Sequence, residues 1–518
     1  MTRPCMLRWH LRTLTFLAVV AAFSTPAMGS SSCPPGTREH SSSCVLDSDL
    51  ILVEPLELRS FTTLNCRGRR ILTSSPGSGT TQESYVPSVP ALAIAITGDR
   101  GATVKNCVIG LEDSRFDFGI IAINSKNPGQ NVHQIRNNEI HARDSGITLL
   151  RVDDANVIDN VLSWTNGFGV LIQRDSDRNR VRNNRLSSPG LPAAAVRLVP
   201  EGAFLPGGNV LPDDGILLAG GLDWEIVLYN LVIGGRLFQL PNSVDGQYPS
   251  LDDNVIEGNH VSLPGSSEGK SHGGIFVAGK AYRSLVIGNT VEQAGVGIRF
   301  AGGMPAQPVQ RAARCVNPAG QALDRYCETS ADCSIPGIDP APLGTCPALV
   351  QDVFDARGRE SVAEANTLIG PFNSTVQARR TAIFGGAGTV GGIIRGNRIT
   401  GTGTEAGISL LGNMLETGDV TGNVVRGASF GLLLQTMGAT RFGARVFLND
   451  LTGSTTRAVG VLGPYAFPTE LSWNGEGNFW GHAAPPCFDV SDSPIPALIQ
   501  DSHPFCAPVA ASLETGNN

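Results

Sequence analysis

Aliphatic residues recur along most of the chain at fixed distances from an asparagine. The order is an aliphatic residue, two residues, Asn, one residue and a second aliphatic, as in residues 135–140, 157–162 and 181–186. A repeat of this kind sets the architecture and is interpreted before any single motif. Every copy has an aliphatic residue at +2, and every copy except the first, which has Thr103, also has one at −3. The copies centre on Asn106, Asn138, Asn160, Asn184, Asn230, Asn259, Asn289, Asn397, Asn423 and Asn449.

A second pattern alternates with the first, a glycine followed by alternating aliphatic residues. The two patterns together give a period of about 22 to 30 residues with two or three short strands in each. A degenerate copy around Asn366 divides the longest interval. The glycines of the second pattern are Gly146, Gly169, Gly215, Gly274, Gly297, Gly407 and Gly431.

Short strands separated by Gly and Asn bends predict coils that stack on one another. No sustained helical periodicity accompanies them. Asn tolerates a left-handed bend, and its amide can bond the Asn of the next coil. The repeat therefore predicts an all-β, single-domain, right-handed parallel β-helix of about 11 coils with a rise of ~4.8 Å per coil. We expect five asparagines to stack in one line: Asn138, Asn160, Asn184, Asn259 and Asn289.

Three short segments carry a resemblance to a known group of proteins. Residues 63–68 and 104–109 resemble the first coils of bacterial parallel β-helix repeat proteins of the pectin-lyase-like superfamily. Gly477-Asn478-Phe479-Trp480-Gly481 is similar to the phrase that often ends such rods. The resemblance implies the fold, and leaves the activity open among polysaccharide lyases, hydrolases and passive adhesins.

The N-terminus is typical of a secretory signal peptide. Arg3, Arg8 and Arg12 precede the apolar residues 14–23, and small residues follow. Cleavage near Gly29 predicts a secreted, extracellular or periplasmic protein. Ten cysteines remain, which predicts disulfides within local groups. The groups are Cys33 and Cys44; Cys66 and Cys107; Cys315, Cys327, Cys333 and Cys346; and Cys487 and Cys506. A disulfide between Cys66 and Cys107 is expected to join two early coils.

These features divide the chain into six parts. A signal peptide (1–29) precedes a disulfide-containing cap (30–50) and the N-terminal part of the β-helix (51–300). A Cys- and Pro-rich insertion (301–360), the C-terminal part of the β-helix (361–485) and a cap with a tail (486–518) follow. Residues 198–213 and 241–252 interrupt the repeat, either as walls of a site or as plain loops.

Composition narrows the possible partners. The formal net charge is −7 without a basic block, which disfavours nucleic acid. No apolar run is long enough to span a membrane. The eight His and six Met are scattered, which disfavours copper handling.

The residue two positions before each glycine of the second pattern lies at a common corner, which includes Asp144, Asp213 and His272. Asp213-Asp214-Gly215-Ile216 and Ser271-His272-Gly273-Gly274 resemble fragments of polygalacturonase motifs, although the other motifs of those enzymes are missing. The resemblance implies Asp213, Asp214 and His272 as catalytic residues. One degenerate coil at 236–240 would place these acids about 10 Å from the histidine. The same acids are also ordinary turn residues.

Basic side chains near this corner suggest a substrate. Four residues are candidates to bind an acidic glycan: Lys270, Lys280, Arg283 and Asp144. The three cations would hold a uronate carboxylate. They also fit a solvated face.

Calcium is the one cofactor that the sequence suggests: Asp153-Asp154 and Asp252-Asp253 are candidate ligands, although both pairs also fit a turn. Two functions stay open. One is a glycoside hydrolase or polysaccharide lyase, and the other is a non-catalytic extracellular or cell-surface solenoid that binds glycans or partners. The sequence does not indicate an oligomeric state.

Overall fold

A computed structural model describes residues 33–508, with gaps. The residues outside the description are 1–32, 42, 75–91, 99, 126–131, 166–167, 174–175, 189–193, 200–250, 265–272, 279–280, 302–306, 312, 317–321, 328–344, 346–349, 355–357, 373–379, 386–388, 412–417, 436–442, 464–468, 483–484, 489–490, 496–497 and 509–518. In the described part no helix is long and apolar enough to cross a membrane.

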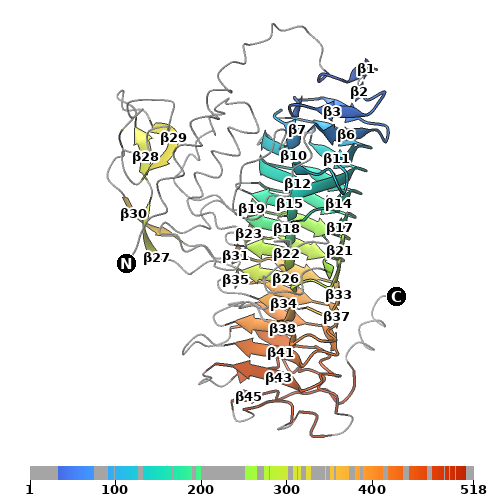
Figure 1. Cartoon of the computed structure of the whole chain (residues 1–518). Coiled ribbons are helices and arrows are strands. Elements are labelled where there is room, and N and C mark those ends of the chain that lie inside the picture. The colour runs from blue at the N-terminus through green and yellow to red at the C-terminus, as the bar shows by residue number, and fades with distance from the viewer. Residues whose placement is uncertain are drawn as a thin grey trace, which may run out of the picture.

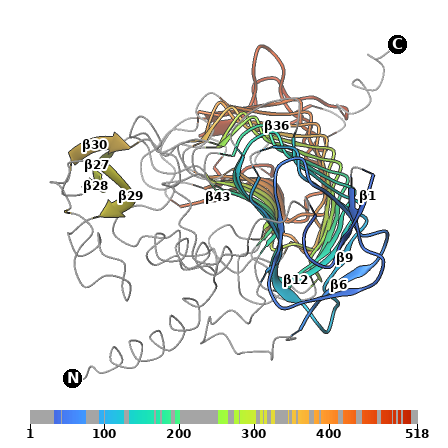
Figure 2. The same cartoon turned by 90° about the horizontal axis from the view of Figure 1, so that it is seen from above.

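Three long sheets of stacked parallel strands run the length of a rod (Figure 1). We call them sheets A, B and C in the order in which each coil passes through them. Viewed from above, successive coils superimpose in one outline (Figure 2). The chain is therefore all-β, with each strand paired to its equivalent one coil away.

Sheet A has one three-residue strand per coil, and only its first pair, β1 with β2, is antiparallel. Its strands are β1 (Arg38–His40), β2 (Ser43–Val45), β5 (Thr63–Asn65), β8 (Thr103–Lys105), β11 (Gln134–Arg136), β13 (Asn156–Ile158), β16 (Arg180–Arg182), β20 (Val255–Glu257), β24 (Leu285–Ile287), β32 (Val362–Glu364), β36 (Ile393–Arg395), β39 (Asp419–Thr421) and β42 (Arg445–Phe447).

Sheet B follows sheet A after a sharp bend and joins sheet C through the long strand β12. Its strands are β3 (Leu50–Leu52), β6 (Arg70–Thr73), β9 (Val108–Ile109), the start of β12 (Glu139–Val152), β14 (Val161–Ser163), β17 (Arg185–Ser187), β21 (His260–Ser262), β25 (Thr290–Glu292), β33 (Thr367–Ile369), β37 (Arg398–Thr400) and β40 (Val424–Arg426).

Sheet C has the longer strands, which contain the Gly-aliphatic pattern. They are β4 (Leu56–Leu58), β7 (Leu92–Ile96), β10 (Phe116–Ser125), the end of β12, β15 (Phe168–Gln173), β18 (Ala194–Val199), β22 (Gly273–Ala278), β26 (Val296–Ala301), β34 (Thr381–Gly385), β38 (Ala406–Leu411), β41 (Phe430–Gln435) and β43 (Arg457–Leu462).

A narrow fourth sheet, the corner sheet, lies between sheets C and A. It consists of β19 (Leu251–Asp252), β23 (Ala281–Tyr282), β31 (Gly358–Arg359) and β35 (Thr389–Val390). Three further pairs lie outside the long sheets: antiparallel β27 (Gln307–Arg311) with β30 (Val350–Phe354), antiparallel β28 (Ala313–Val316) with β29 (Ala322–Cys327), and parallel β44 (Thr469–Glu470) with β45 (Ile499–Gln500).

The repeated aliphatic residues fill the inside of the rod. Ile135 and Ile140, the −3 and +2 positions around Asn138, are both fully buried. Their equivalents Val157 and Leu162, one coil on, are also fully buried. Each coil thus stacks its core residues on those of its neighbours, as the repeat predicted.

The predicted line of asparagines is confirmed. Each side-chain amide donates to Oδ1 of the next asparagine at 2.8–3.0 Å, and each also donates to a backbone carbonyl of the preceding coil. The buried ladder comprises Asn138, Asn160, Asn184, Asn259, Asn289, Asn366, Asn397, Asn423, Asn449 and Asn478, and it ends at Asp501.

Two members of the sequence repeat are not in this ladder. Asn106 is exposed, with φ of 55°, and the backbone N–H of the next residue, Cys107, bonds Oδ1 of Asn138 instead. Cys107, one residue after Asn106, therefore occupies the ladder position of this coil, which explains the irregular Thr103. Asn230 lies outside the described residues, and Asn184 bonds Asn259 directly across that interval.

The prediction of further coils that contain Gly215, Asn230 and residues 236–240 is wrong. β16 pairs directly with β20, β17 with β21 and β18 with β22. No coil position is left for Gly215 or for residues 236–240.

Three disulfides among the described residues lie near the two ends of the rod. Cys66 and Cys107 are bonded, with Cα atoms 4.7 Å apart, as predicted. Cys33–Cys44 lies in the first cap and Cys487–Cys506 in the last. The side chains of Cys315, Cys327, Cys333 and Cys346 lie outside the description, as do the signal-peptide residues 1–29. At the C-terminal end Trp480 is buried and its Nε1 donates to Oδ2 of Asp501 at 2.9 Å.

Candidate functional site

Both long departures from the rod leave and return at one corner, between sheets C and A. One leaves after Val199 of β18 and returns at Leu251 of β19, and the other leaves after Ala301 of β26 and returns at Gly358 of β31. The corner-sheet strands lie one above another along this edge, on the same side of the rod as β27 to β30 (Figure 1). Because insertions on repeat folds often border functional surfaces, this corner is the candidate site.

Ten side chains on five successive coils make up what we call the acidic corner. Six are carboxylates, three are arginines and one is a tyrosine. They come in consecutive pairs: Asp153 and Asp154, Asp177 and Arg178, Asp252 and Asp253, Tyr282 and Arg283, and Arg359 and Glu360.

One bend shape repeats in all five coils of the acidic corner. The second residue of each pair has φ between 50° and 60°. In each of the first four coils, its N–H donates to the carbonyl of the first residue in the next coil, for example from Asp154 to Asp177 at 2.9 Å and from Asp253 to Tyr282 at 3.0 Å. Equivalent side chains are therefore held one coil rise apart, about 4.8 Å.

Three aspartates form a row parallel to the rod axis. Oδ1 of Asp153 accepts the N–H of Asp177 at 3.0 Å, and Oδ1 of Asp177 accepts the N–H of Asp252 at 2.9 Å. Each carboxylate thereby fixes the bend of the following coil. The side chain of Asp153 is 5% exposed and that of Asp252 is 28% exposed, so the row opens to solvent toward Asp252.

Two arginines each bind an aspartate pair in the same way. Arg178 holds both oxygens of Asp154, at 2.9 and 3.1 Å, and Oδ2 of Asp153. Arg283 holds both oxygens of Asp253, at 2.7 and 3.1 Å, and Oδ2 of Asp252. The hydrogen bonds to Asp154 and Asp253 are the main reason that the pKa values of Arg178 and Arg283 are raised.

This pairing changes what the sequence suggested for these residues. Both aspartate pairs considered for calcium are bound to an arginine. Arg283, a candidate for a uronate carboxylate, already has two carboxylate partners. Among the described residues, no three His, Cys, Asp or Glu side chains form a group suited to a metal ion.

Tyr282 adds an aromatic ring to the more open end of the acidic corner. It is half-buried, and the guanidinium carbon of Arg359 lies 5.6 Å from its ring centroid. Asp253, which is 46% exposed, lies one coil away. Carboxylates and an aromatic ring therefore face solvent together at this end.

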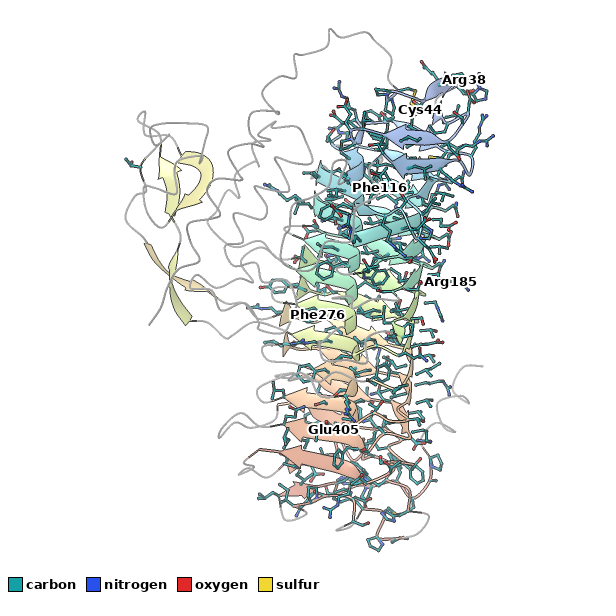
Figure 3. All side chains as sticks on the ribbon, viewed as in Figure 1. Arg38, Cys44, Phe116, Arg185, Phe276 and Glu405 are labelled. Atoms are coloured by element: carbon teal, nitrogen blue, oxygen red, sulfur yellow. A yellow bond between two sulfur atoms is a disulfide. The ribbon has the colours of Figure 1, made fainter. Side chains whose placement is uncertain are left out.

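The outer face of sheet C, by contrast, is buried. Arg299 lies between two phenylalanines of adjacent coils, with its guanidinium carbon 4.8 Å from the ring centroid of Phe276 and 5.7 Å from that of Phe384. All three side chains are less than 10% exposed. Phe276 lies on the other side of the rod from Arg185 in the view of Figure 3. This face is therefore closed to a large ligand.

Most of the site residues predicted from sequence lie outside the described residues. These are Asp213, Asp214, Lys270, His272 and Lys280. Asp144 lies within β12, but its side chain is also outside the description.

Val199, within the 198–213 interruption, and Gly273, the residue after His272, lie at different ends of their strands in sheet C. β18 and β22 are parallel, with Ala194 opposite Gly273. The loop leaves at the end of β18, whereas Gly273 lies at the start of β22. The two points are therefore at opposite ends of sheet C.

Sequence reasoning missed Asp177, Arg178, Tyr282, Arg359 and Glu360. Their signal was available in the register of the repeat, because each pair stands at the same distance before a strand of sheet A. Aligning the coils at the buried residue of that strand would have put them in one column.

Residues 92–309 match the family model described as a right handed beta helix region. No curated protein sequence matches the chain. Among solved structures, the Dettilon tailspike protein is similar with a TM-score of 0.36 and 14% identity, over 80% of this chain and 60% of that one. The chain thus spans less than two thirds of that protein.

Two further solved structures are similar at the same level. The catalytic domain of GH87 alpha-1,3-glucanase in complex with nigerose has a TM-score of 0.34 and 8% identity, over 88% of this chain and 71% of that one. The Streptococcus pneumoniae surface protein and adhesin PfbA has a TM-score of 0.27 and 11% identity, over 81% and 90%.

Proposed function

We propose that this chain, which is a right-handed parallel β-helix protein, binds a neutral polysaccharide along its acidic corner. The observation that carries the proposal is the row of Asp153, Asp177 and Asp252, which leads to the half-buried ring of Tyr282 at one-coil intervals. A linear glycan laid parallel to the rod axis would meet equivalent groups on each coil it crosses.

The chemistry of the open end suits sugar hydroxyls. Charge-assisted hydrogen bonds from a hydroxyl to a carboxylate are shorter and stronger than neutral ones. Arg283 holds Asp252 and Asp253 in fixed positions, which lowers the ordering cost of binding. Tyr282 offers an aromatic surface against which the apolar face of a sugar ring can pack.

The charge balance favours a neutral glycan over a uronic-acid polymer. The acidic corner has six carboxylates against three arginines, and two of those arginines are already bound to carboxylates. A polymer with one carboxylate per sugar would meet like charge at close range. We therefore propose neutral sugars in place of the acidic glycans that the sequence motifs suggested.

The test is affinity electrophoresis of the full chain in gels that contain neutral α- or β-glucans, mannan or polygalacturonate. Retardation by at least one neutral polymer is expected, with polygalacturonate retarding less. Tyr282→Ala should reduce the affinity about tenfold, because a buried aromatic contact contributes ~1.5 kcal/mol. Trp473→Ala is the matched control, since Trp473 is exposed near the C-terminal end and lies outside the acidic corner. Equal loss in both variants, or retardation by polygalacturonate alone, would refute the proposal.

Turnover of the bound glycan is a second candidate function. One observation favours it: the segment that contains Asp213 and Asp214 is joined at both ends to the acidic corner, after Val199 and before Leu251. In this form of the proposal the protein is a glycoside hydrolase or polysaccharide lyase, with Asp213, Asp214 and His272 as catalytic residues. Release of reducing ends from the polymer that binds tests it. Asp214→Asn should abolish release without weakening retardation, and an active variant would move the chemistry elsewhere.

We further propose that the protein is exported after cleavage near Gly29 and that it contains about 11 coils with a Cys-rich insertion at 301–360. The paired cysteines at both ends of the rod support an oxidising compartment. Mass spectrometry of the mature protein tests both the cleavage site and the pairing of Cys315, Cys327, Cys333 and Cys346.

A further inference from the structure

A second charged surface follows the bend between sheets A and B. We call it the basic ridge. It has eight cationic side chains on neighbouring coils, and four carboxylates accompany them: Asp49, Glu139, Asp159 and Glu257. The cations are Arg67, Arg69, Arg70, Lys105, Arg136, Arg180, Arg182 and Arg185.

Strand register brings these residues together from distant parts of the sequence. Lys105 at the end of β8 lies opposite Arg136 at the end of β11, and the same column continues through Ile158 to Arg182. On the other side of the bend, Arg70 and Arg185 lie in the first column of sheet B. The ridge spans five coils, or about 20 Å at ~4.8 Å per coil.

Most of these cations have no anionic partner in the part of the chain that the structure describes. Within the described residues, only Arg182 forms an ion pair, with Glu257 at 2.8 Å. Lys105 and Arg182 are half-buried, and the other six are exposed. The basic ridge is thus a concentration of unpaired positive charge on a chain whose formal net charge is −7.

The ridge is convex. Val181 and Leu186 point into the core, which turns Arg182 and Arg185 outward on the two sides of a two-residue bend. Figure 3 shows Arg185 at the edge of the rod, and the nearby β17 lies on the side away from β27 to β30 in Figure 1. Long arginine side chains on both sides of such a bend can reach one plane. A single polymer strand bound to this convex surface would not be enclosed by side chains on either side.

We propose that the basic ridge docks the rod on an anionic lipid surface, with its long axis parallel to the membrane plane. Each Lys or Arg close to such a surface adds attraction, and the attraction falls off within a Debye length. The acidic corner lies at a different edge of each coil, so its glycan site stays accessible. The proposal does not depend on the proposed glycan function.

Cosedimentation with vesicles tests this inference. The full chain is mixed with vesicles of phosphatidylcholine, with or without phosphatidylglycerol, at low ionic strength and at about 0.15 M salt. Binding only to the phosphatidylglycerol vesicles, and weaker binding at higher salt, is expected. The triple variant Arg136→Gln, Arg180→Gln, Arg185→Gln should bind these vesicles about a hundredfold more weakly, because each cation near the surface contributes about 1 kcal/mol.

A control variant of equal net charge separates the ridge from overall charge. Arg59→Gln, Arg380→Gln, Arg457→Gln removes three exposed arginines away from the ridge and should bind almost as the parent chain does. Equal loss in the two triple variants would overturn the proposal, as would failure to bind phosphatidylglycerol at low salt. Ridge-dependent binding to polygalacturonate without vesicle binding would reassign the ridge to an acidic polysaccharide.

Discussion

The side-chain amide of Asn184 donates to Oδ1 of Asn259 at 2.9 Å, although the two residues are 75 positions apart in sequence. The backbone N–H of Asn184 donates to the same oxygen at 2.9 Å. One acceptor thus fixes both the side chain and the bend of the preceding coil. This contact closes the coil across the interval 200–250 and keeps the register of the sheets on both sides of it.

Replacing Asn259 by alanine should strongly destabilise the rod. The change leaves two N–H groups of Asn184 without an acceptor. It also removes the side-chain amide of Asn259, which donates to Oδ1 of Asn289 and to the carbonyl of Val181. Buried unsatisfied polar groups cost about 1–3 kcal/mol each, so a loss of at least ~3 kcal/mol is expected. Urea denaturation followed by circular dichroism measures it.

Asn183→Gly is the matched control for the ladder. Asn183 is the exposed neighbour of Asn184, and its φ of 55° suits glycine without strain. Its unfolding midpoint should stay within ~0.5 kcal/mol of the parent value. If Asn259→Ala unfolded at the same urea concentration as this control, the ladder would not be a principal source of stability.

The sequence predicts the coils well because their two determinants are local. A buried asparagine and the aliphatic residues at −3 and +2 lie within six residues, so each coil can be recognised from its own sequence. The order of the coils is less local. Asn230 fits the pattern by sequence, yet Asn184 bonds Asn259, and only the pairing of β17 with β21 shows that these two strands belong to neighbouring coils.

A glycine in sheet C supplies a second stability test. A Cβ atom on Gly146 would lie 2.7 Å from the carbonyl oxygen of Gly169 on the next coil and 2.6 Å from Cδ2 of Leu162. The leucine can shift, but the backbone oxygen is held in the sheet. Gly146→Ala should therefore cost about 1–3 kcal/mol by overpacking, measured by thermal unfolding.

Gly288→Asn is the counterpart to Gly146→Ala. A Cβ atom on Gly288 would meet nothing within 4 Å, and its φ of 63° is close to that of Asn183 at the equivalent position of another coil. Its stability should be nearly unchanged. A larger loss at Gly288 than at Gly146 would contradict the steric account.

The disulfide between Cys66 and Cys107 should stabilise chiefly the first coils. Both cysteines are buried and join coils 41 residues apart in sequence. Cys66→Ala with Cys107→Ala should lower stability by about 2–4 kcal/mol. Because a rod of repeats can open from one end, amide hydrogen exchange should rise first in β5 and β8. Removing Cys487 and Cys506 should leave exchange in those two strands unchanged.

The charged surfaces could not be predicted to the same extent. Arg67 and Arg185 are 118 positions apart, and the short run Arg67-Gly68-Arg69-Arg70 supplies only three of the eight cations, so the basic ridge does not stand out as one block in the sequence. Ion pairing is equally hidden. Asp252 and Asp253 resemble a metal-binding pair in sequence, but the next coil supplies Arg283 as their partner. Contacts between coils depend on register, which the spacing of the repeat alone leaves undefined.

Asp501 should make the C-terminal end sensitive to pH. Burial raises the pKa of this carboxyl above its usual range, even though Asn478, Trp480 and His503 donate hydrogen bonds to it. The folded state therefore takes up a proton at a higher pH than the unfolded chain does. The contribution of this group to stability is greatest below the unfolded pKa of about 3.9, and it is lost as the pH rises through the folded value.

Asp501→Asn keeps an acceptor for Asn478 and Trp480 but cannot titrate. The difference in Tm between the parent chain and this variant should move in favour of the parent as the pH is lowered from 7 toward 4. A difference that moves the other way would mean that the hydrogen bonds outweigh the desolvation of the carboxylate.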